Sequence, residues 1–253
     1  ITSDCRGIKF IDKDKYNIRI LDVTRISKNF FLIIFQIFLI FNSILKALLI
    51  LKKSKIEIVI STGGYMSLPL CLASKILNIK LFLFEPNMVL GKSNKFFINY
   101  CEKIFCYSNR IKNFPKKLTD KISVIPPLLR KEFYNIKEID NTNKDVNLLI
   151  IGGSQGAKFF DTVIQSTIVK LSKKYKIKVY QQTRLNNFQK LKFFYQSNKI
   201  DHELFDFNDE ISISMNKANI CITRAGASTL AELVFLNIPH VTIPLPAAKD
   251  NHQ

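Results

Sequence analysis

The stretch VNLLIIGGSQGAKFF, residues 146–160, decides the fold of this chain. Val146–Ile151 is an apolar run that glycine follows directly, with the length and composition of a strand buried on both faces. Between Ala157 and Lys173 apolar residues recur at helical spacing, so a helix is expected there. The glycines at positions 152, 153 and 156 therefore form a strand-to-helix turn.

This turn is a candidate anion site. The first backbone N–H groups of a helix have no internal partner, and they point outward beside the positive end of the helix dipole. Phosphate is the anion most often bound at such a place. The alternative is a tight turn in which the glycines only permit a positive φ.

The other glycines also indicate ligand binding. Open α/β sheets bind their ligands at the carboxyl ends of their strands. Seven of the eight glycines follow or adjoin a strand-like run, at four places: Gly63 and Gly64; Gly91; Gly152, Gly153 and Gly156; and Gly226.

Composition bounds the class of protein. A chain of 253 residues with 47% hydrophobic and 23% charged residues can hold two globular domains. The formal net charge is +18, and residues 1–145 carry 25 basic and 12 acidic residues against 13 and 8 in residues 146–253. Most of the magnitude of the charge is attributed to a Lys-, Ile- and Asn-rich composition of the kind that a biased genomic base composition produces. The uneven distribution of the charge indicates that the first half meets an anionic surface. No DNA- or RNA-binding signature is present, so no nucleic-acid partner is expected.

The cysteines and the chain ends give two further expectations. Four of the five cysteines lie in apolar runs, and none forms a CxxC pair, which indicates reduced core thiols of a cytoplasmic protein. No signal peptide is recognised. The chain begins at Ile1 without methionine and stops at Gln253 without a closing helix, so we expect a fragment incomplete at both ends.

Strand-like runs form two series separated by a polar segment, residues 135–145, that is typical of a linker. Helical stretches lie between most of the runs, which predicts parallel sheets with right-handed crossovers. The expected architecture is α/β, with two Rossmann-like domains, residues 1–140 and 141–253, facing a cleft. The expected strands are Ile18–Val23, Ile56–Ser61, Lys80–Glu85, Lys103–Tyr107, Ser123–Ile125, Val146–Ile151, Lys176–Gln181, Glu203–Phe205, Asn219–Thr223 and His240–Ile243.

The apolar stretch Phe30–Lys53 is almost long enough to cross a bilayer. Gln36 and Lys46 are among the polar residues that interrupt it, and a crossing would separate the strand at Ile18 from the rest of its sheet. We therefore expect a helix that packs one side on the sheet and lays an apolar side, flanked by lysines, in a membrane interface. The alternative is a fully buried core helix.

Two loops in the first half place polar groups at strand ends. In STGGY, residues 61–65, the glycine pair exposes backbone N–H groups suited to a phosphate or a sugar. In FEPNMVLGKSNK, residues 84–95, Pro86 disfavours helix, so Glu85 and Asn87 are expected to face the cleft. The alternative is an Asx turn built by Asn87.

In the second half, RAGASTLAEL, residues 224–233, contains Thr229 and Glu232 at the spacing of a capping box. Alternatively, Glu232 accepts hydrogen bonds from a ribose diol, as acidic residues do in nucleotide-binding folds. The terminal PLPAAKDNHQ becomes polar after the last expected strand, where a ligand would lie. Asp12 and Asp14 are interpreted as solvated surface rather than metal ligands, so a bound diphosphate would rely on amides and a cation, for which we choose Arg130.

Taken together and in this order, ISTGGY, FEPNMVLGKSNK, LLIIGGSQGA, RAGASTLAEL and PLPAAKDNHQ resemble the MurG family over nearly the whole chain. GGSQGA combined with RAGASTLAE is specific, although each motif alone is weak. These peptidoglycan transferases move GlcNAc from UDP-GlcNAc to the MurNAc of lipid I, which is undecaprenyl-pyrophosphoryl-MurNAc-pentapeptide, and so form lipid II. The resemblance implies a GT-B fold, inversion at the anomeric centre, no metal or other cofactor, and peripheral attachment to the cytoplasmic face of the bacterial plasma membrane.

The resemblance also implies roles for individual residues. Ser154 and Gln155, with the neighbouring amides, would hold the phosphates and sugar of the donor, and Glu232 would bind its ribose. Arg130 would assist the diphosphate. Uracil would lie near Phe207 and Asn208, and Gln253 with His252 would touch the GlcNAc. The full implied donor set is Arg130, Gly153, Ser154, Gln155, Gly156, Phe207, Asn208, Arg224, Gly226, Thr229, Glu232, His252 and Gln253, and the implied acceptor set is Gly63, Gly64, Tyr65 and Asn87.

The chain departs from the family pattern at two motifs. The usual HEQN is FEPN here, and the usual GNPVR is PPLLR, so the His and Gln roles at the first motif are absent. The family's glycine-rich loop ending in histidine, a candidate for acceptor diphosphate binding and for the general base, would lie before Ile1. A base must take the proton from the attacking hydroxyl. No residue is assigned to that role, and Glu85 is the local candidate.

Two other functions fit the same motifs. One is another GT-B transferase with a lipid acceptor such as diacylglycerol. The other is a non-catalytic, membrane-docked UDP-sugar binder. A nucleotide oxidoreductase is disfavoured, since no GxGxxG follows a strand.

Overall fold

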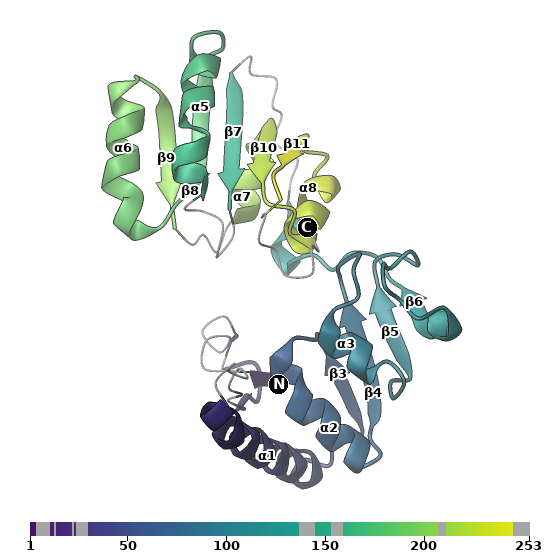
Figure 1. Ribbon diagram of the computed structural model, residues 1–253. Helices are drawn as coiled ribbons and strands as arrows, with labels where there is room; N and C mark the ends of the chain where they lie inside the picture. The colour runs from purple at the N-terminus through teal and green to yellow at the C-terminus, as the bar shows by residue number, and fades with distance from the viewer. Residues whose placement is uncertain are drawn as a thin grey trace. The chain divides into compact units, whose positions relative to one another are not determined.

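The computed structural model describes residues 1–3, 11–12, 14–21, 23, 30–136, 145–152, 159–206 and 211–244. The chain divides into two compact units, Ile1–Pro126 and Pro127–Gln253 (Figure 1). The placement of one unit relative to the other is not determined, so each is described by itself.

The second unit is built on a five-stranded parallel sheet in the order β11-β10-β7-β8-β9. From the central β7 the chain runs outward through β8 and β9 on one side, and through β10 and β11 on the other. The strand order therefore reverses between β7 and β10, and such a switch point is where open α/β sheets bind ligands. The strands are β7 (Val146–Ile151), β8 (Ile177–Gln182), β9 (Asp201–Phe205), β10 (Ile220–Thr223) and β11 (His240–Thr242).

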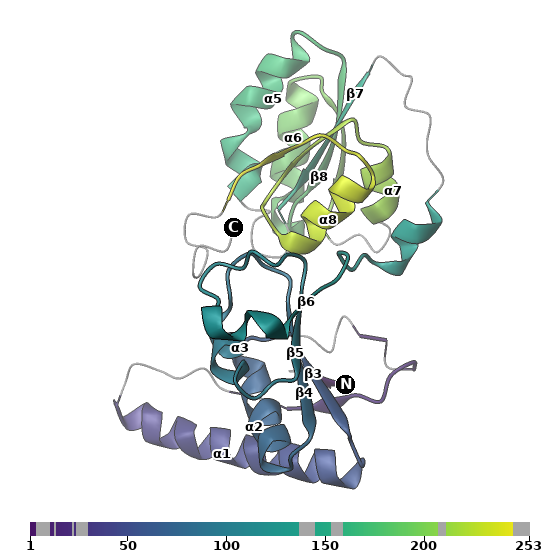
Figure 2. The same ribbon diagram turned by 90° about the vertical axis from the view of Figure 1, so that its right-hand side faces the viewer.

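Helices cover both faces of this sheet, because right-handed crossovers on the two sides of the reversal lie on opposite faces. α5 (Gln165–Ser172) and α6 (Phe188–Ser197) cover one face, and α7 (Ile211–Asn216) and α8 (Ala227–Phe235) cover the other (Figures 1 and 2). Leu148 and Ile150 of β7 pack in the core under α5 and α6, whereas Leu149 and Ile151 pack in the core under α7 and α8. The expectation of a strand buried on both faces is confirmed.

The helix expected over residues 157–173 is interrupted in the structure. Residues 159–163 are helical, Ile164 forms a turn, and α5 begins at Gln165. Phe160, Ile164 and Ile168 are nevertheless all buried, which is the apolar spacing that predicted the helix. The glycine-rich turn before it, residues 153–158, lies outside the described residues.

The segment that follows Pro126 belongs to the second unit. The short helix η4 (Lys131–Asn135) carries Phe133, which is 1% exposed and packs in the same core as Leu149 and Leu233. The units divide between residues 126 and 127, earlier than the expected boundary between residues 140 and 141. The sequence contained a signal for this, since Leu129, Phe133 and Ile136 recur at apolar spacing and all pack on that core.

The first unit contains a four-stranded parallel sheet in the order β3-β4-β5-β6. Because each crossover runs in the same direction, α2 (Leu68–Ile76) and α3 (Lys92–Phe97) lie on one face, and α1 (Phe30–Lys53) packs beside α2 (Figures 1 and 2). The strands are β3 (Ile58–Ser61), β4 (Lys80–Glu85), β5 (Lys103–Cys106) and β6 (Ile122–Val124), and the short helices are η2 (Tyr65–Ser67) and η3 (Lys116–Lys121).

One expected strand does not join this sheet. β1 (Thr2–Ser3) and β2 (Arg19–Ile20) form a separate two-stranded parallel sheet. The expectation that the strand near Ile18 belongs to the main sheet is therefore wrong. Leu21, directly after β2, still packs in the core of the first unit, which explains the apolar character of the run.

α1 has one buried and one exposed side, as expected. Ala47 and Leu51 are buried in the core of the first unit. The opposite side of the helix is exposed, so the alternative of a fully buried helix is wrong. On that side six large apolar residues are 43% to 69% exposed: Phe35, Ile37, Phe38, Phe41, Leu45 and Leu49. The part Phe35–Lys53 is long and apolar enough to cross a membrane, by length and composition only.

Candidate active site

The carboxyl edge of the second sheet holds the described part of the expected donor site. β7 ends at Ile151 and β10 ends at Thr223, and these two residues are paired in register. Gly152 after β7 leads into the glycine-rich turn, and Arg224 follows β10. The two most specific motifs of the sequence therefore begin side by side at the switch point.

Arg130 and Glu232 form a bidentate ion pair. Arg130 donates from Nε to Oε1 of Glu232 at 2.7 Å and from Nη2 to Oε2 at 2.9 Å. Glu232 is 3% exposed, whereas the side chain of Arg130 is 44% exposed. Two parallel charge-assisted hydrogen bonds hold both groups in a fixed orientation. The structure thus brings together two residues, 102 positions apart, that the sequence analysis assigns to one donor molecule.

The capping-box interpretation of Thr229 and Glu232 is wrong. α8 begins at Ala227 with Gly226 as its N-cap, and no side chain caps it. Thr229 lies in the first turn of α8, half-buried, and Glu232 lies within the helix, facing Arg130. A glutamate in the interior of a helix is free to contact a ligand or a partner side chain instead of the helix start.

Arg224 is a buried cation with unmet hydrogen-bonding capacity. It is 6% exposed, and its Nη1 donates to the carbonyl oxygens of Ile243 and Pro244, each at 3.0 Å. Its guanidinium lies 4.0 Å from the centre of the Phe159 ring, and burial lowers the pKa of the group. Nε and Nη2 are buried and have no hydrogen-bond partner among the residues that the structure describes. Buried N–H groups are rarely left unpaired, so these two indicate a missing acceptor at this edge of the sheet.

The remaining expected donor residues lie outside the described part of the chain. They are Gly153, Ser154, Gln155, Gly156, Phe207, Asn208, His252 and Gln253.

Sequence reasoning missed a buried polar network around Asp161. Asp161, 6% exposed, lies in the helix that follows the turn, and its carboxylate accepts hydrogen bonds from Gln181, Thr183 and Asn187. The Tyr195 hydroxyl donates to Gln181 Oε1. Burial, together with the negative charge of Asp161, raises the pKa of this tyrosine. The network fixes the helix to the end of β8. The available signal was one acidic residue among apolar neighbours.

In the first unit, the glycine pair expected to face the acceptor forms a tight turn between β3 and η2. Gly63 and Gly64 both have φ of 79°, a conformation that favours glycine. The Gly63 N–H donates to Ser61 Oγ at 3.2 Å, and Ser67 Oγ donates to the Gly64 carbonyl at 2.8 Å. Tyr65 begins η2 directly after the glycine pair.

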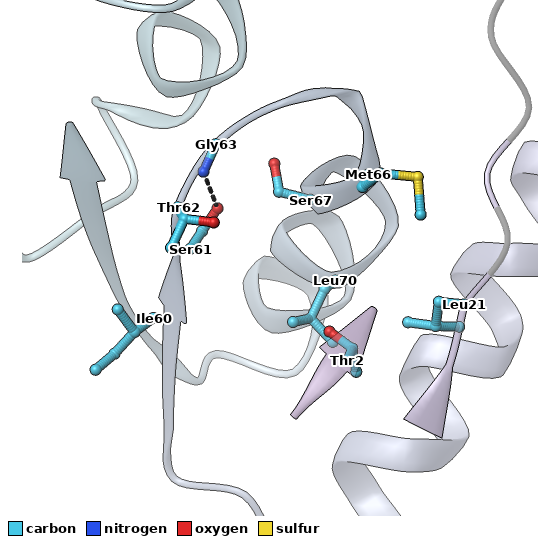
Figure 3. A pocket seen from close by; sticks show the side chains of 9 residues that line it. All are labelled: Thr2, Leu21, Ile60, Ser61, Thr62, Gly63, Met66, Ser67 and Leu70. Carbon is cyan, nitrogen blue, oxygen red and sulfur yellow. Dashed lines mark hydrogen bonds between the residues drawn. The ribbon is translucent and has the colours of Figure 1, made fainter. Parts of the chain in front are cut away.

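A cavity of about 100 Å³ lies beside this turn (Figure 3). Both hydroxyl-bearing and apolar side chains line it (Figure 3). The lining residues are Thr2, Leu21, Ile60, Ser61, Thr62, Gly63, Met66, Ser67 and Leu70.

Glu85, the local candidate for the base, is 3% exposed and fully engaged. Its Oε1 accepts from the N–H of Asn87 at 3.3 Å and from Asn87 Nδ2 at 3.0 Å, and its Oε2 accepts from the Gly91 N–H at 2.8 Å and from Asn94 Nδ2 at 3.0 Å. With four donors on its two oxygens, this carboxylate is not placed to take a proton from a substrate. Asn87 binds Glu85 through its amide donors, which differs from the Asx turn considered as an alternative.

Within the described ranges, no group of three or more His, Cys, Asp and Glu side chains could hold a metal ion. At the carboxyl edge of the second sheet, the described charged groups include the guanidinium groups of Arg130 and Arg224 and the carboxylate of Glu232.

Two parallel-sheet units in one chain, the second doubly wound with a buried arginine at its switch point, have the architecture of the GT-B class. Comparisons with known proteins agree. Residues 3–106 match the glycosyltransferase family 28 N-terminal domain, and residues 147–253 match the C-terminal domain of the same family. Over its full length the chain is similar in fold to the MurG of Acinetobacter baumannii, with a TM-score of 0.75, 22% identity and 70% of that chain covered.

Curated relatives are closer in sequence. The chain is 59% identical to the UDP-N-acetylglucosamine--N-acetylmuramyl-(pentapeptide) pyrophosphoryl-undecaprenol N-acetylglucosamine transferase of Pelagibacter ubique, with 100% of this chain and 71% of the relative covered. It is 36% identical to the protein of the same name from Rickettsia canadensis, with 99% and 71% covered. The chain belongs to the MurG family of glycosyltransferases.

Proposed function

We propose that this chain transfers GlcNAc from UDP-GlcNAc to the MurNAc of lipid I, giving lipid II in peptidoglycan synthesis. The observation that carries the proposal is the ion pair between Arg130 and Glu232 at 2.7 and 2.9 Å. These are the two residues expected to bind the diphosphate and the ribose of one nucleotide, and they occupy one place at the carboxyl edge of the second unit. Relatives named for this reaction support the substrates.

The donor would bind at the switch point. A ribose diol would donate to the Glu232 carboxylate, and the diphosphate would accept from the Arg130 guanidinium and from backbone amides of the glycine-rich turn. The unpaired Nε and Nη2 of Arg224 would supply further donors to the donor sugar or its phosphates. When the glycosidic bond breaks, negative charge remains on the departing UDP. Fixed cations and amide dipoles stabilise that charge without reorganising, which is the main source of rate acceleration in such sites.

The acceptor would bind at the loops of the first unit. The cavity beside Gly63 offers hydroxyls and an apolar wall, and Asn87 lies in the neighbouring loop. The attacking hydroxyl needs a base. The described geometry of Glu85 disfavours it for that role, so the base is not assigned among the described residues.

The exposed side of α1 would hold the enzyme at the cytoplasmic face of the plasma membrane. Six large apolar side chains lie on it, and Lys46, Lys52 and Lys53 belong to the same helix. Apolar residues bury their surface in the interface, and each lysine near an anionic leaflet contributes about 1 kcal/mol. Such a position would bring the protein to a lipid-linked acceptor.

Calorimetry with UDP-GlcNAc tests the proposal. Glu232→Ala should weaken binding by about 1 to 3 kcal/mol, because it removes the ribose acceptor and leaves Arg130 without its partner. Glu132→Ala is the matched control, since Glu132 lies 3.8 Å from the same Arg130 Nε but is exposed, and it should change binding little. Equal affinity of Glu232→Ala and the wild-type chain would contradict the donor site.

The acceptor is tested separately. Transfer of labelled GlcNAc to a lipid I analogue, and not to diacylglycerol, is the expected result. Transfer to diacylglycerol would favour another lipid-acceptor GT-B enzyme. Binding of UDP-GlcNAc without transfer to either acceptor would favour a non-catalytic binder.

A further inference from the structure

Asn94 and Glu85 form a buried pair between two loops of the first unit. Asn94 is 2% exposed and Glu85 is 3% exposed. Asn94 Nδ2 donates to the Phe84 carbonyl at 3.1 Å and to Glu85 Oε2 at 3.0 Å, and the same Glu85 oxygen accepts from the Gly91 N–H at 2.8 Å. Asn94 therefore reaches the loop of residues 86–91 through Glu85.

The orientation of the Asn94 amide is determined by these bonds. Both of its partners are oxygens that only accept, so the nitrogen must face them and the oxygen must face away. Asn94 Oδ1 is buried and has no hydrogen-bond partner in the described part of the chain. It lies against the other loop, because a Cβ placed on Gly63 would be 3.2 Å from both Oδ1 and Nδ2 of Asn94.

Gly63 and Gly64 differ in their contact with Asn94. Both have φ of 79°, so alanine at either position is strained by the backbone. A Cβ on Gly63 would press on Asn94, whereas a Cβ on Gly64 would have no atom within 4 Å. The turn of residues 61–65 therefore touches the pair at Gly63.

We propose that Asn94 is a positioning residue for the acceptor, which couples the Gly63 turn to the Asn87-bearing loop through Glu85. The coupling itself rests on the geometry of the first unit, and its meaning for the acceptor rests on the proposed function. Both amide hydrogens of Asn94 are donated to the end of β4, at Phe84 and Glu85, while the amide group also lies against the Gly63 turn. A shift of the turn should therefore be transmitted through Glu85 to the Gly91 N–H.

Amide hydrogen exchange measures the coupling without any substrate. Gly63→Ala should push the Asn94 amide away from Glu85 and speed exchange of the Gly91 N–H by about tenfold relative to Gly64→Ala. Asn94→Asp should do the same, because it replaces the donor with an oxygen that faces Glu85 Oε2 and the Phe84 carbonyl. Equal exchange of Gly91 in Gly63→Ala and Gly64→Ala would overturn the coupling, whether or not Asn94→Asp folds.

Kinetics with a lipid I analogue then test the acceptor role. Asn94→Asp should raise KM for the acceptor by about tenfold and leave the Kd for UDP-GlcNAc unchanged. An equal loss of donor binding would overturn the assignment to the acceptor. A wild-type chain that does not bind UDP-GlcNAc would count against the proposed function, while the exchange comparison would still decide the coupling.

Discussion

The two units of this protein use parallel sheets in different ways, and the difference locates their sites. In the second unit the strand order reverses between β7 and β10, helices cover both faces, and Arg224 and Glu232, the residues proposed to bind the donor, follow the strand at the reversal. In the first unit the strands follow one another in sequence order, and Ile58 and Ile60 on the face away from α2 are 52% and 62% exposed. There the loops are organised by a buried side-chain pair. The proposed donor site depends on sheet topology and the proposed acceptor site on loop chemistry, so the two should respond to different substitutions.

The largest expected effect is a loss of membrane binding, with nucleotide binding by the second unit unchanged. The double substitution Phe38→Glu and Phe41→Glu on α1 removes two exposed rings, each worth about 1.5 to 3 kcal/mol when buried. We expect loss of binding to vesicles with anionic lipid, measured by co-sedimentation, and an unchanged Kd for UDP-GlcNAc.

Phe193→Glu, on α6 of the second unit, is the control for this change, because Phe193 is 73% exposed but lies in the other unit. It should leave vesicle binding intact. A parallel loss of vesicle binding and nucleotide binding in the α1 variant would mean that the side chains at 38 and 41 support the fold.

The next effect concerns the donor alone. Arg224→Leu removes the buried guanidinium and should weaken UDP-GlcNAc binding by about 1.5 to 3 kcal/mol, the value of hydrogen bonds to a charged group. The melting temperature should change little, since the two unpaired N–H groups disappear together with the bonds to Ile243 and Pro244. Arg110→Leu, an exposed arginine of the first unit, should have no effect on nucleotide binding. A collapse of the fold in Arg224→Leu would assign the arginine to structure.

A smaller effect sharpens the link between the two donor residues. A double-mutant cycle with Arg130→Ala and Glu232→Ala should show a coupling free energy of about 1 kcal/mol in the stability of the second unit, since residues joined by charged hydrogen bonds are not additive. Chemical denaturation of the four proteins measures it. Additive losses would show that the ion pair contributes nothing to the unit.

The smallest effect is shared by both units and concerns their thiols. Burial raises the pKa of Cys106 to about 11, with Glu85 adding to the rise, and burial raises the pKa of Cys221 to about 12, from an ordinary value of 9.0. A thiol reagent at pH 8 should therefore react with neither in the folded protein and with both after denaturation. In the unfolded chain these thiols ionise at lower pH than in the folded protein. Their contribution to the free energy of unfolding is therefore complete below about pH 9 and is lost as the pH rises from about 9 to about 12.

The sequence predicted the sheet of the second unit well, because β7 is apolar on every buried position and glycine ends it cleanly. The structure divides the units at Pro126, earlier than expected, because the expectation followed the polar segment 135–145 and overlooked the apolar spacing of Leu129, Phe133 and Ile136 around the short helix η4. The strand near Ile18 was also expected in the wrong sheet, because strand pairing depends on partners far away in the chain.

For the site, residue type was a better guide than local pattern. Glu232 was found from a motif whose spacing equally fits a capping box, and only the start of α8 at Ala227 separates the two. Glu85 had the right chemistry for a base, but its four hydrogen-bond donors come from residues up to nine positions away, which no local rule counts. Asn94 had no signal at all, because its role depends on contacts with Gly63 across the fold.

The burial of Phe133 has a practical consequence for dissecting this enzyme. A recombinant donor module that starts at the polar segment near residue 145 would lose this aromatic anchor and would also lose Arg130, the partner of Glu232. Its nucleotide affinity would then report on an incomplete unit. A donor module that starts at Pro127 retains both residues, so it is best separated from the first unit between Pro126 and Pro127.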